Sequence, residues 1–180
     1  MKNPALNNDP MQDARVILML GISSPGYRSL ALSYLREALL RDQRLPSLMV
    51  GSIETNTAQD PWWIAYRILN LAHKPDFIAI PCYCWNMSSV KSIIKILESE
   101  LPEAKIILGG PEVSPIAAQT LEENPHAHAV ISGEGEKALC NFIHSHMRGG
   151  DPSSVAGVTM RVEGEIVTGP PAQVIKKLDD

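Results

Sequence analysis

The sequence predicts an α/β fold: a doubly wound, five-stranded parallel sheet of strand order 2-1-3-4-5, with a C-terminal β-hairpin. Short apolar runs rich in β-branched residues alternate with stretches whose apolar residues recur every three to four positions, as strands and amphipathic helices require. The connections between them are short and rich in Gly, Pro and Ser. Five strand–helix units in succession favour parallel strands joined by crossover helices.

The first three strands follow this rhythm. Residues 15–20 form the first predicted strand, and a helix with one apolar side follows over residues 29–41. Residues 47–53 form the second strand. Asp60 and Pro61 then begin a helix as cap and first residue, and residues 76–81 form the third strand. The helix carries adjacent tryptophans at its start, of which we expect one in the core and one on the surface.

The second half repeats the pattern. We expect Ser88 to cap the third helix, and residues 105–108 to form a strand that stops at a Gly-Gly-Pro turn. Ser114 and Pro115 are predicted to open the next helix as N-cap and first-turn residue, with its positive end aimed at the turn. Residues 128–132 form the fifth strand and a helix follows it. Two short runs joined by Glu163-Gly164 predict a hairpin at the edge of the sheet or leading to a further domain.

Composition limits what the chain can be. The 180 residues are 44% hydrophobic, enough for one domain with a full core, and the net charge of −4 argues against a nucleic-acid partner. No apolar run reaches the length of a membrane span, and residues 1–14, a predicted flexible lead-in, lack the pattern of a secretory signal. Three cysteines form no disulfide framework, which favours the cytoplasm. We assign residues 15–150 to the domain and 151–180 to hairpin and linker.

A ligand site is expected at the carboxyl edge of the sheet, where ligands of open parallel sheets bind. Gly109 and Gly110 leave the fourth strand's end bare, so a flat ligand can lie against the backbone. In the neighbouring third loop, Tyr83 and Trp85 could pave an apolar surface and Asn86 could donate a hydrogen bond. The other interpretation is a capping loop whose aromatic residues close the core.

Other cofactors are less well supported by the loops. Gly133, Gly135 and Ala138 satisfy the dinucleotide pattern, but they follow the fifth strand and their flanking glutamates would repel a pyrophosphate. The third strand ends in Pro81-Cys82, where a receiver domain would carry its phosphorylated aspartate. The first loop also lacks the threonine-rich phosphate nest of a flavodoxin. A single Cys-x-Cys at residues 82–84 is poor evidence for zinc, and the cysteines read better as small hydrophobic residues.

The fourth-loop run Leu-Gly-Gly-Pro-Glu, the fifth-loop run Gly-Glu-Gly-Glu and the Cys/Tyr/Trp-Asn third loop resemble the N-terminal cobalamin-binding domain of radical S-adenosylmethionine (SAM) enzymes. The resemblance covers residues 15–150 and implies that the corrin lies on the carboxyl edge. It suggests these cofactor contacts: Ser23, Ser24, Cys82, Tyr83, Cys84, Trp85, Asn86, Gly109, Gly110, Pro111, Glu112, Gly133, Glu134, Gly135 and Glu136.

Two departures refine this expectation. The Asp-x-His-x-x-Gly motif that supplies a lower cobalt ligand in mutases is absent, so no histidine is assigned to cobalt. The Cys-x-x-x-Cys-x-x-Cys motif for a [4Fe-4S] cluster is also absent. The resemblance therefore implies that the cluster, the SAM site and the catalytic barrel lie beyond Asp180, on another chain, or nowhere.

The sequence thus predicts a cobalamin-binding module that is not catalytic alone, within a parent radical SAM enzyme of methyltransferase type. Methyl transfer from methylcobalamin to a carbon radical is implied by the family only. The alternative is a flavodoxin-like module that mediates protein interaction or senses a nucleotide, without cobalamin.

Overall fold

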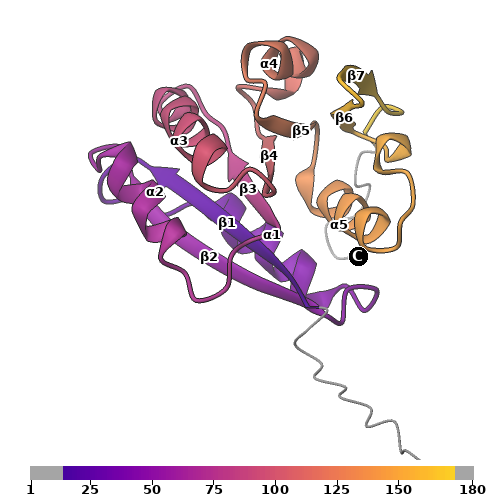
Figure 1. Cartoon of the computed structure of the whole chain (residues 1–180), viewed down its shortest axis with the longest axis horizontal. Helices are drawn as coiled ribbons and strands as arrows, with labels where there is room; N and C mark the ends of the chain where they lie inside the picture. The colour runs from indigo at the N-terminus through magenta and orange to yellow at the C-terminus, as the bar shows by residue number, and fades with distance from the viewer. Residues whose placement is uncertain (1–13, 173–180) are drawn as a thin grey trace, which may run out of the picture.

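The computed structural model describes residues 14–172, which form one seven-stranded sheet flanked by helices (Figure 1). The predicted lead-in falls almost wholly outside these residues, and so does the end of the predicted linker. The strands are β1 Arg15–Ser23, β2 Leu48–Asn56, β3 Phe77–Pro81, β4 Lys105–Gly109, β5 Ala127–Ile131, β6 Val158–Val162 and β7 Glu165–Thr168. The helices are α1 Leu30–Arg41, α2 Pro61–Leu69, α3 Met87–Glu100, α4 Ala117–Glu123 and α5 Gly135–Met147, with short 3-10 turns η1 Ser114–Ile116 and η2 Pro152–Ser154.

The sheet order is β2-β1-β3-β4-β5-β6-β7, and β1 to β5 run parallel. This confirms the predicted 2-1-3-4-5 order. The sheet has seven strands rather than five, because the hairpin joins it: β6 pairs antiparallel with β5, and β7 with β6. Glu163 and Gly164 both have positive φ, 49° and 92°, which the two-residue hairpin turn requires.

The four parallel strands inside the edge strand β2 are largely buried on both faces because helices cover each side. Along β1, Leu18 and Leu20 point into a core shared with α2, α3 and α4, whereas Ile17 and Met19 point into one shared with α1 and α5. Figure 1 shows α2, α3 and α4 along one side of the sheet and α5 on the other. Within residues 14–172, no helix has the length and apolar character to cross a bilayer.

Several boundaries differ from the prediction. β1 continues to Ser23 because it pairs with β2 over its whole length, and Ile22 is buried. Asn86, not Ser88, stands at the N-cap of α3, and its side chain makes no capping bond there. Asp60 caps α2 as predicted, accepting a hydrogen bond from the Trp62 N–H. Both Trp62 and Trp63 are exposed, which corrects the expectation that one lies in the core.

The region after β4 also differs. Ser114 and Pro115 form a 3-10 turn, and α4 begins at Ala117 with Ile116 as its cap. The Ser114 hydroxyl instead donates to the Gly110 carbonyl at 2.8 Å, closing the turn. α4 is seven residues long and starts after this turn, so the argument that a helix terminus aims at the ligand edge fails.

Candidate functional site

The predicted site residues follow the carboxyl ends of four neighbouring strands: β1, β3, β4 and β5. Ser23 ends β1, Gly109 ends β4, and the residues after β3 and β5 begin the third and fifth loops. Because β1, β3, β4 and β5 are adjacent and parallel, these loops meet at one edge of the sheet, as predicted.

The third loop is held by Asn86, whose side chain is fully buried. Its amide nitrogen donates to the carbonyls of Ile22 (3.0 Å) and Pro81 (2.9 Å), and its oxygen accepts from the Tyr83 N–H (2.9 Å). These bonds tie the ends of β1 and β3 to the loop. Asn86 therefore positions the loop, and its buried donor is not directed at a ligand as the sequence suggested.

Cys82 is likewise buried, and its backbone connects the third loop with the fourth. Its N–H donates to the Gly109 carbonyl at 2.6 Å, and its carbonyl accepts from the Glu112 N–H at 3.4 Å. Burial raises the pKa of the Cys82 thiol to about 12, and burial does the same for Cys140. Both thiols are therefore protonated at neutral pH. Within residues 14–172, no three His, Cys, Asp or Glu side chains gather as a metal site would need.

The paired glycines of the fourth loop have separate roles. Gly110 has φ of +106°, and a Cβ there would lie 2.6 Å from the Cys82 carbonyl oxygen. Because only glycine adopts this φ readily and has no Cβ to clash with that oxygen, Gly110 lets the third and fourth loops approach each other. Gly109 has ordinary strand geometry, and a Cβ there would lie 3.3 Å from the Ile131 carbonyl oxygen. Both glycines line the cavity described next.

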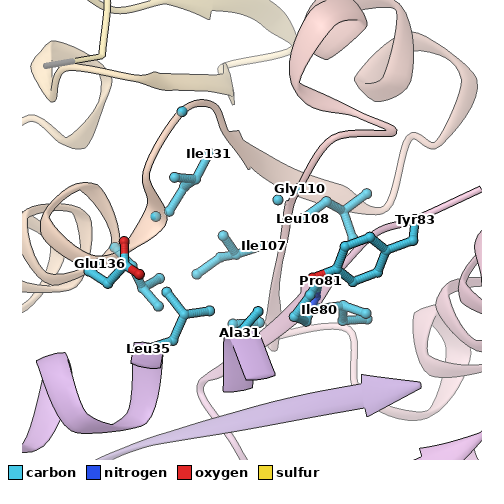
Figure 2. A pocket seen from close by; sticks show the side chains of 15 residues that line it. Ala31, Leu35, Ile80, Pro81, Tyr83, Ile107, Leu108, Gly110, Ile131 and Glu136 are labelled. Atoms are coloured by element: carbon cyan, nitrogen blue, oxygen red, sulfur yellow. The ribbon is translucent and has the colours of Figure 1, made fainter. Parts of the chain in front are cut away.

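An apolar cavity of about 150 Å³ opens at this edge, between α1 and α5 on one side of the sheet (Figure 2). Ala79, Ile107 and Ile131 come from the strands, whereas Leu35 and Leu139 come from the helices. Small residues make the space, because Ala and Gly stand where larger side chains would fill it. The remaining lining residues are Ala31, Ile80, Pro81, Tyr83, Leu108, Gly109, Gly110, Gly133, Gly135 and Glu136.

An aromatic ridge stands beside the cavity. Tyr83 and Trp85 stack with ring centroids 4.5 Å apart and planes 5° from parallel, and Trp85 is 54% exposed. A groove of about 350 Å³ runs between this ridge and the first loop. It is lined by Ser23, Ser24, Tyr27, Arg28, Ser29, Leu30, Tyr83 and Trp85. Trp85 therefore faces outward, whereas the half-buried Tyr83 lines both the cavity and the groove, and neither ring belongs to the buried core.

The fifth loop is covered by the segment that follows the hairpin. A Cβ on Gly133 would lie 2.7 Å from the Ala172 Cβ, and the Gly157 N–H donates to the Pro170 carbonyl at 2.7 Å. Glu136 lines the cavity, while Glu134 and Pro111 do not. The structure thus divides most of the predicted contacts into cavity residues, groove residues and loop supports, and Cys84, Pro111 and Glu134 line neither the cavity nor the groove.

Sequence reasoning missed the helix side of the site. Ala31 and Leu35 of α1 and Leu139 of α5 line the cavity, but their helical spacing alone is that of any buried stripe. The available signal was size: alanine and glycine at Ala31, Ala79 and Gly135 leave unfilled volume where α1 and α5 approach β3.

Exposed hydrophobic side chains gather around the same edge. Tyr27 and Leu30 follow β1, Trp62 and Trp63 follow β2, and Trp85 follows β3. Concentrated apolar surface of this kind marks a face that is covered by a ligand or another domain.

A doubly wound α/β domain with an apolar cavity at the carboxyl edge is of the class that holds a cofactor through its strand-end loops. Residues 67–143 match the family model described as B12 binding domain. The match runs from α2 to α5 and includes the third, fourth and fifth loops. This segment is therefore similar to a B12-binding domain, and the resemblance drawn from the loop motifs is confirmed.

Two curated relatives match nearly the whole chain. The chain is 25% identical over 170 residues to the cobalamin-dependent radical SAM methyltransferase TokK of Streptomyces tokunonensis, covering 92% of this chain and 24% of TokK. It is 24% identical over 171 residues to an uncharacterized methyltransferase of Pyrococcus horikoshii, covering 95% of this chain and 35% of that protein. The chain thus spans about a quarter to a third of these relatives.

A solved structure shares the fold. The radical SAM methyltransferase TsrM of Kitasatospora setae, with cobalamin and a [4Fe-4S] cluster bound, matches with a TM-score of 0.73 and 19% identity, covering 93% of this chain and 30% of TsrM. The chain thus shares the fold of that part of TsrM.

Proposed function

We propose that this module binds cobalamin at its carboxyl edge and presents it to a radical SAM domain in the same protein. The observation that carries the proposal is the apolar cavity beside the Tyr83–Trp85 ridge, lined mostly by the segment that matches the B12-binding family. A flat macrocycle with a nucleotide tail needs a shallow apolar surface for the ring and a deeper cavity for the base of the tail. This edge has both.

The dimensions suggest which part of cobalamin goes where. Apolar cavities of about 150 Å³ bind single aromatic rings of benzene size, and a corrin is much larger. We expect the heteroaromatic base of the tail to enter between Leu35, Ile107 and Leu139. The corrin would rest outside, near Gly110 and the Tyr83–Trp85 ridge, where backbone and rings exclude water from its lower face.

No protein imidazole is expected to ligate the cobalt. His73 precedes β3, His126 and His128 lie at the start of β5, and His144 and His146 lie in the last turn of α5. These positions all belong to the amino edge of the sheet, opposite the cavity. The first loop offers serine, tyrosine and arginine instead.

When bound, cobalamin supplies a cobalt centre that carries and releases a methyl group. This chain's own residues would bind it, orient it and exclude water beneath it. Methyltransferase activity, the [4Fe-4S] cluster and SAM belong to the proposed parent protein. A cytoplasmic location, with no nucleic-acid or membrane partner, also stays a prediction, resting on charge and cysteine content.

Retention of the corrinoid tests the proposal. The protein is incubated with hydroxocobalamin and desalted, and we expect corrinoid absorbance to remain with the protein. Ala31→Phe should fill the cavity and weaken binding roughly ten-fold or more, since overpacking costs about 1–3 kcal/mol. Leu40→Phe, on an exposed position of the same helix, is the matched control.

Gly110→Trp would not be a suitable variant for blocking the corrin, because the backbone conformation of Gly110 and the neighbouring Cys82 carbonyl leave no room for a side chain. Absence of retained corrinoid in the folded wild-type protein would contradict the proposal. It would favour the alternative, a module for protein interaction or nucleotide sensing, which parallel titrations with FMN and ATP would examine.

A further inference from the structure

One charged side chain lies in the wall of the apolar cavity. Glu136 is the only acidic residue among the described residues that line it, and all the others are apolar, glycine or tyrosine. Figure 2 shows its carboxylate beside Leu35, on the rim opposite Tyr83. A carboxylate placed there meets whatever enters the cavity.

This carboxylate has no partner of its own. Within residues 14–172, no hydrogen bond or ion pair involves the Glu136 side chain, and it is half-buried. It stands in the first turn of α5, a helix of thirteen residues, where the helix dipole favours negative charge. Glu136 is therefore a charged acceptor facing a space whose water an occupant would displace.

Displacement of that water makes Glu136 selective. An occupant without a donor leaves the carboxylate desolvated and unpaired, which is costly, whereas one with an O–H or N–H gains a charge-assisted hydrogen bond. An anionic group in the same place would be repelled. Glu136 thus favours an uncharged donor at the cavity mouth.

We propose that Glu136 accepts a hydrogen bond from a ribose hydroxyl of the cobalamin tail, and so distinguishes complete cobalamin from corrinoids that lack the nucleotide. The inference rests on the proposed function. The tail base is apolar and suits the cavity floor formed by Ala79 and Ile107. The ribose joins that base to the phosphate. With the base on the cavity floor, the ribose would lie at the mouth beside Glu136, and the phosphate would lie further out, because the carboxylate repels it.

The test compares two ligands on the same variants. Hydroxocobalamin carries the tail, and aquacobinamide is the same corrinoid without it. Dissociation constants are measured by absorbance titration for wild type, Glu136→Ala, Glu136→Gln and, as a matched charge control, Glu165→Gln on the exposed edge strand β7. Circular dichroism checks that each variant is folded.

We expect Glu136→Ala to weaken hydroxocobalamin binding roughly ten-fold, the value of one hydrogen bond to a charged group, and to leave aquacobinamide unchanged. Glu136→Gln keeps a neutral acceptor and should lose less. Glu165→Gln should match wild type for both ligands.

Equal weakening of both ligands by Glu136→Ala, or of neither, overturns the inference while leaving cobalamin binding intact. Failure of wild type to bind either ligand overturns the proposed function instead. A second readout uses the tail alone: α-ribazole added to ¹⁵N-labelled protein should shift the amide signals of Gly133, Gly135 and Leu35 in wild type and shift them less in Glu136→Ala. Shifts of equal size in the two proteins would also contradict the inference.

Discussion

The two edges of the parallel sheet are built differently. At the amino edge, ionisable side chains are paired: Arg15 with Asp76 at 2.6 Å, Arg44 with Asp42 at 2.6 Å and His126 with Glu98 at 2.6 Å. At the carboxyl edge, glycines, alanines and exposed aromatic rings surround an apolar cavity. The difference teaches that the amino edge pairs several of its ionisable side chains within the protein, whereas the carboxyl edge leaves apolar surface and the Glu136 carboxylate available to a ligand.

The first prediction would break the carboxyl edge. Gly110→Ala should destabilise the fold by roughly 2–4 kcal/mol, because a left-handed conformation costs L-residues about 1–2 kcal/mol and the new Cβ would press on the Cys82 carbonyl. Urea unfolding measures the loss. Gly26→Ala is the matched control: φ is +86° but no atom lies within 4 Å of the added Cβ, so about 1 kcal/mol is expected. Equal losses would mean that the contact with Cys82 is not tight.

The second prediction concerns two histidines packed at the amino edge. The His128 and His146 rings lie 5.8 Å apart and the Nε2 atom of each is buried without a hydrogen-bond partner in the described part of the chain. Burial, with Lys105 and His146 nearby, lowers the pKa of His128 to about 4. The pKa of His146 is lowered too, chiefly by burial.

Because the pKa of His128 in the folded state lies below its unfolded value of 6.5, the unfolded state takes up the proton first as the pH falls. Stability should be full above pH 6.5 and decline between pH 6.5 and 4, by about 1–2 kcal/mol after allowance for partial exposure. His128→Phe should flatten this decline in urea unfolding measured across that range. An unchanged pH profile in the variant would show that other groups cause the acid sensitivity.

The third and smallest effect belongs to the paired charges. Arg15→Ala removes an ion pair whose arginine is mostly exposed, and should cost about 0.5 kcal/mol or less. Asp76→Ala should cost more, because Asp76 also accepts a hydrogen bond from the Val16 N–H at 2.7 Å. Neither should alter hydroxocobalamin retention, which is measured beside thermal unfolding. A change in retention would mean that the two edges are not independent.

Much of the fold could be predicted because its determinants are local. Apolar runs located the five parallel strands, and Asp60 with Pro61 located the start of α2. The pairing of strands depends on residues that are distant in the sequence. Gly21 and Ser23 look like loop residues, yet they belong to β1 because β2 extends beside them. The exposure of Trp62 and Trp63 also could not be read from spacing, since the buried face of α2 is already filled by Ile64 and Ile68.

The position of the candidate site could be predicted from the sequence, whereas its cavity could not. Strand-end loops meet at one edge by topology alone, so the third, fourth and fifth loops were found. The cavity depends on residues from α1 and α5 whose small size matters only once the helices are placed, as with Ala31 and Gly135. The inward bonds of Asn86 depend on the path of the third loop, and its amide could equally have faced a ligand.

The course of the chain after β7 has a further consequence. Residues 169–172 turn back, Ala172 packs on Gly133, and the backbone so returns to the rim of the cavity. A domain attached through this segment would be tethered close to the ligand that we propose binds at this edge. Its encounter with that ligand becomes intramolecular, at an effective concentration set by tether length and not by how much of either partner the cell contains.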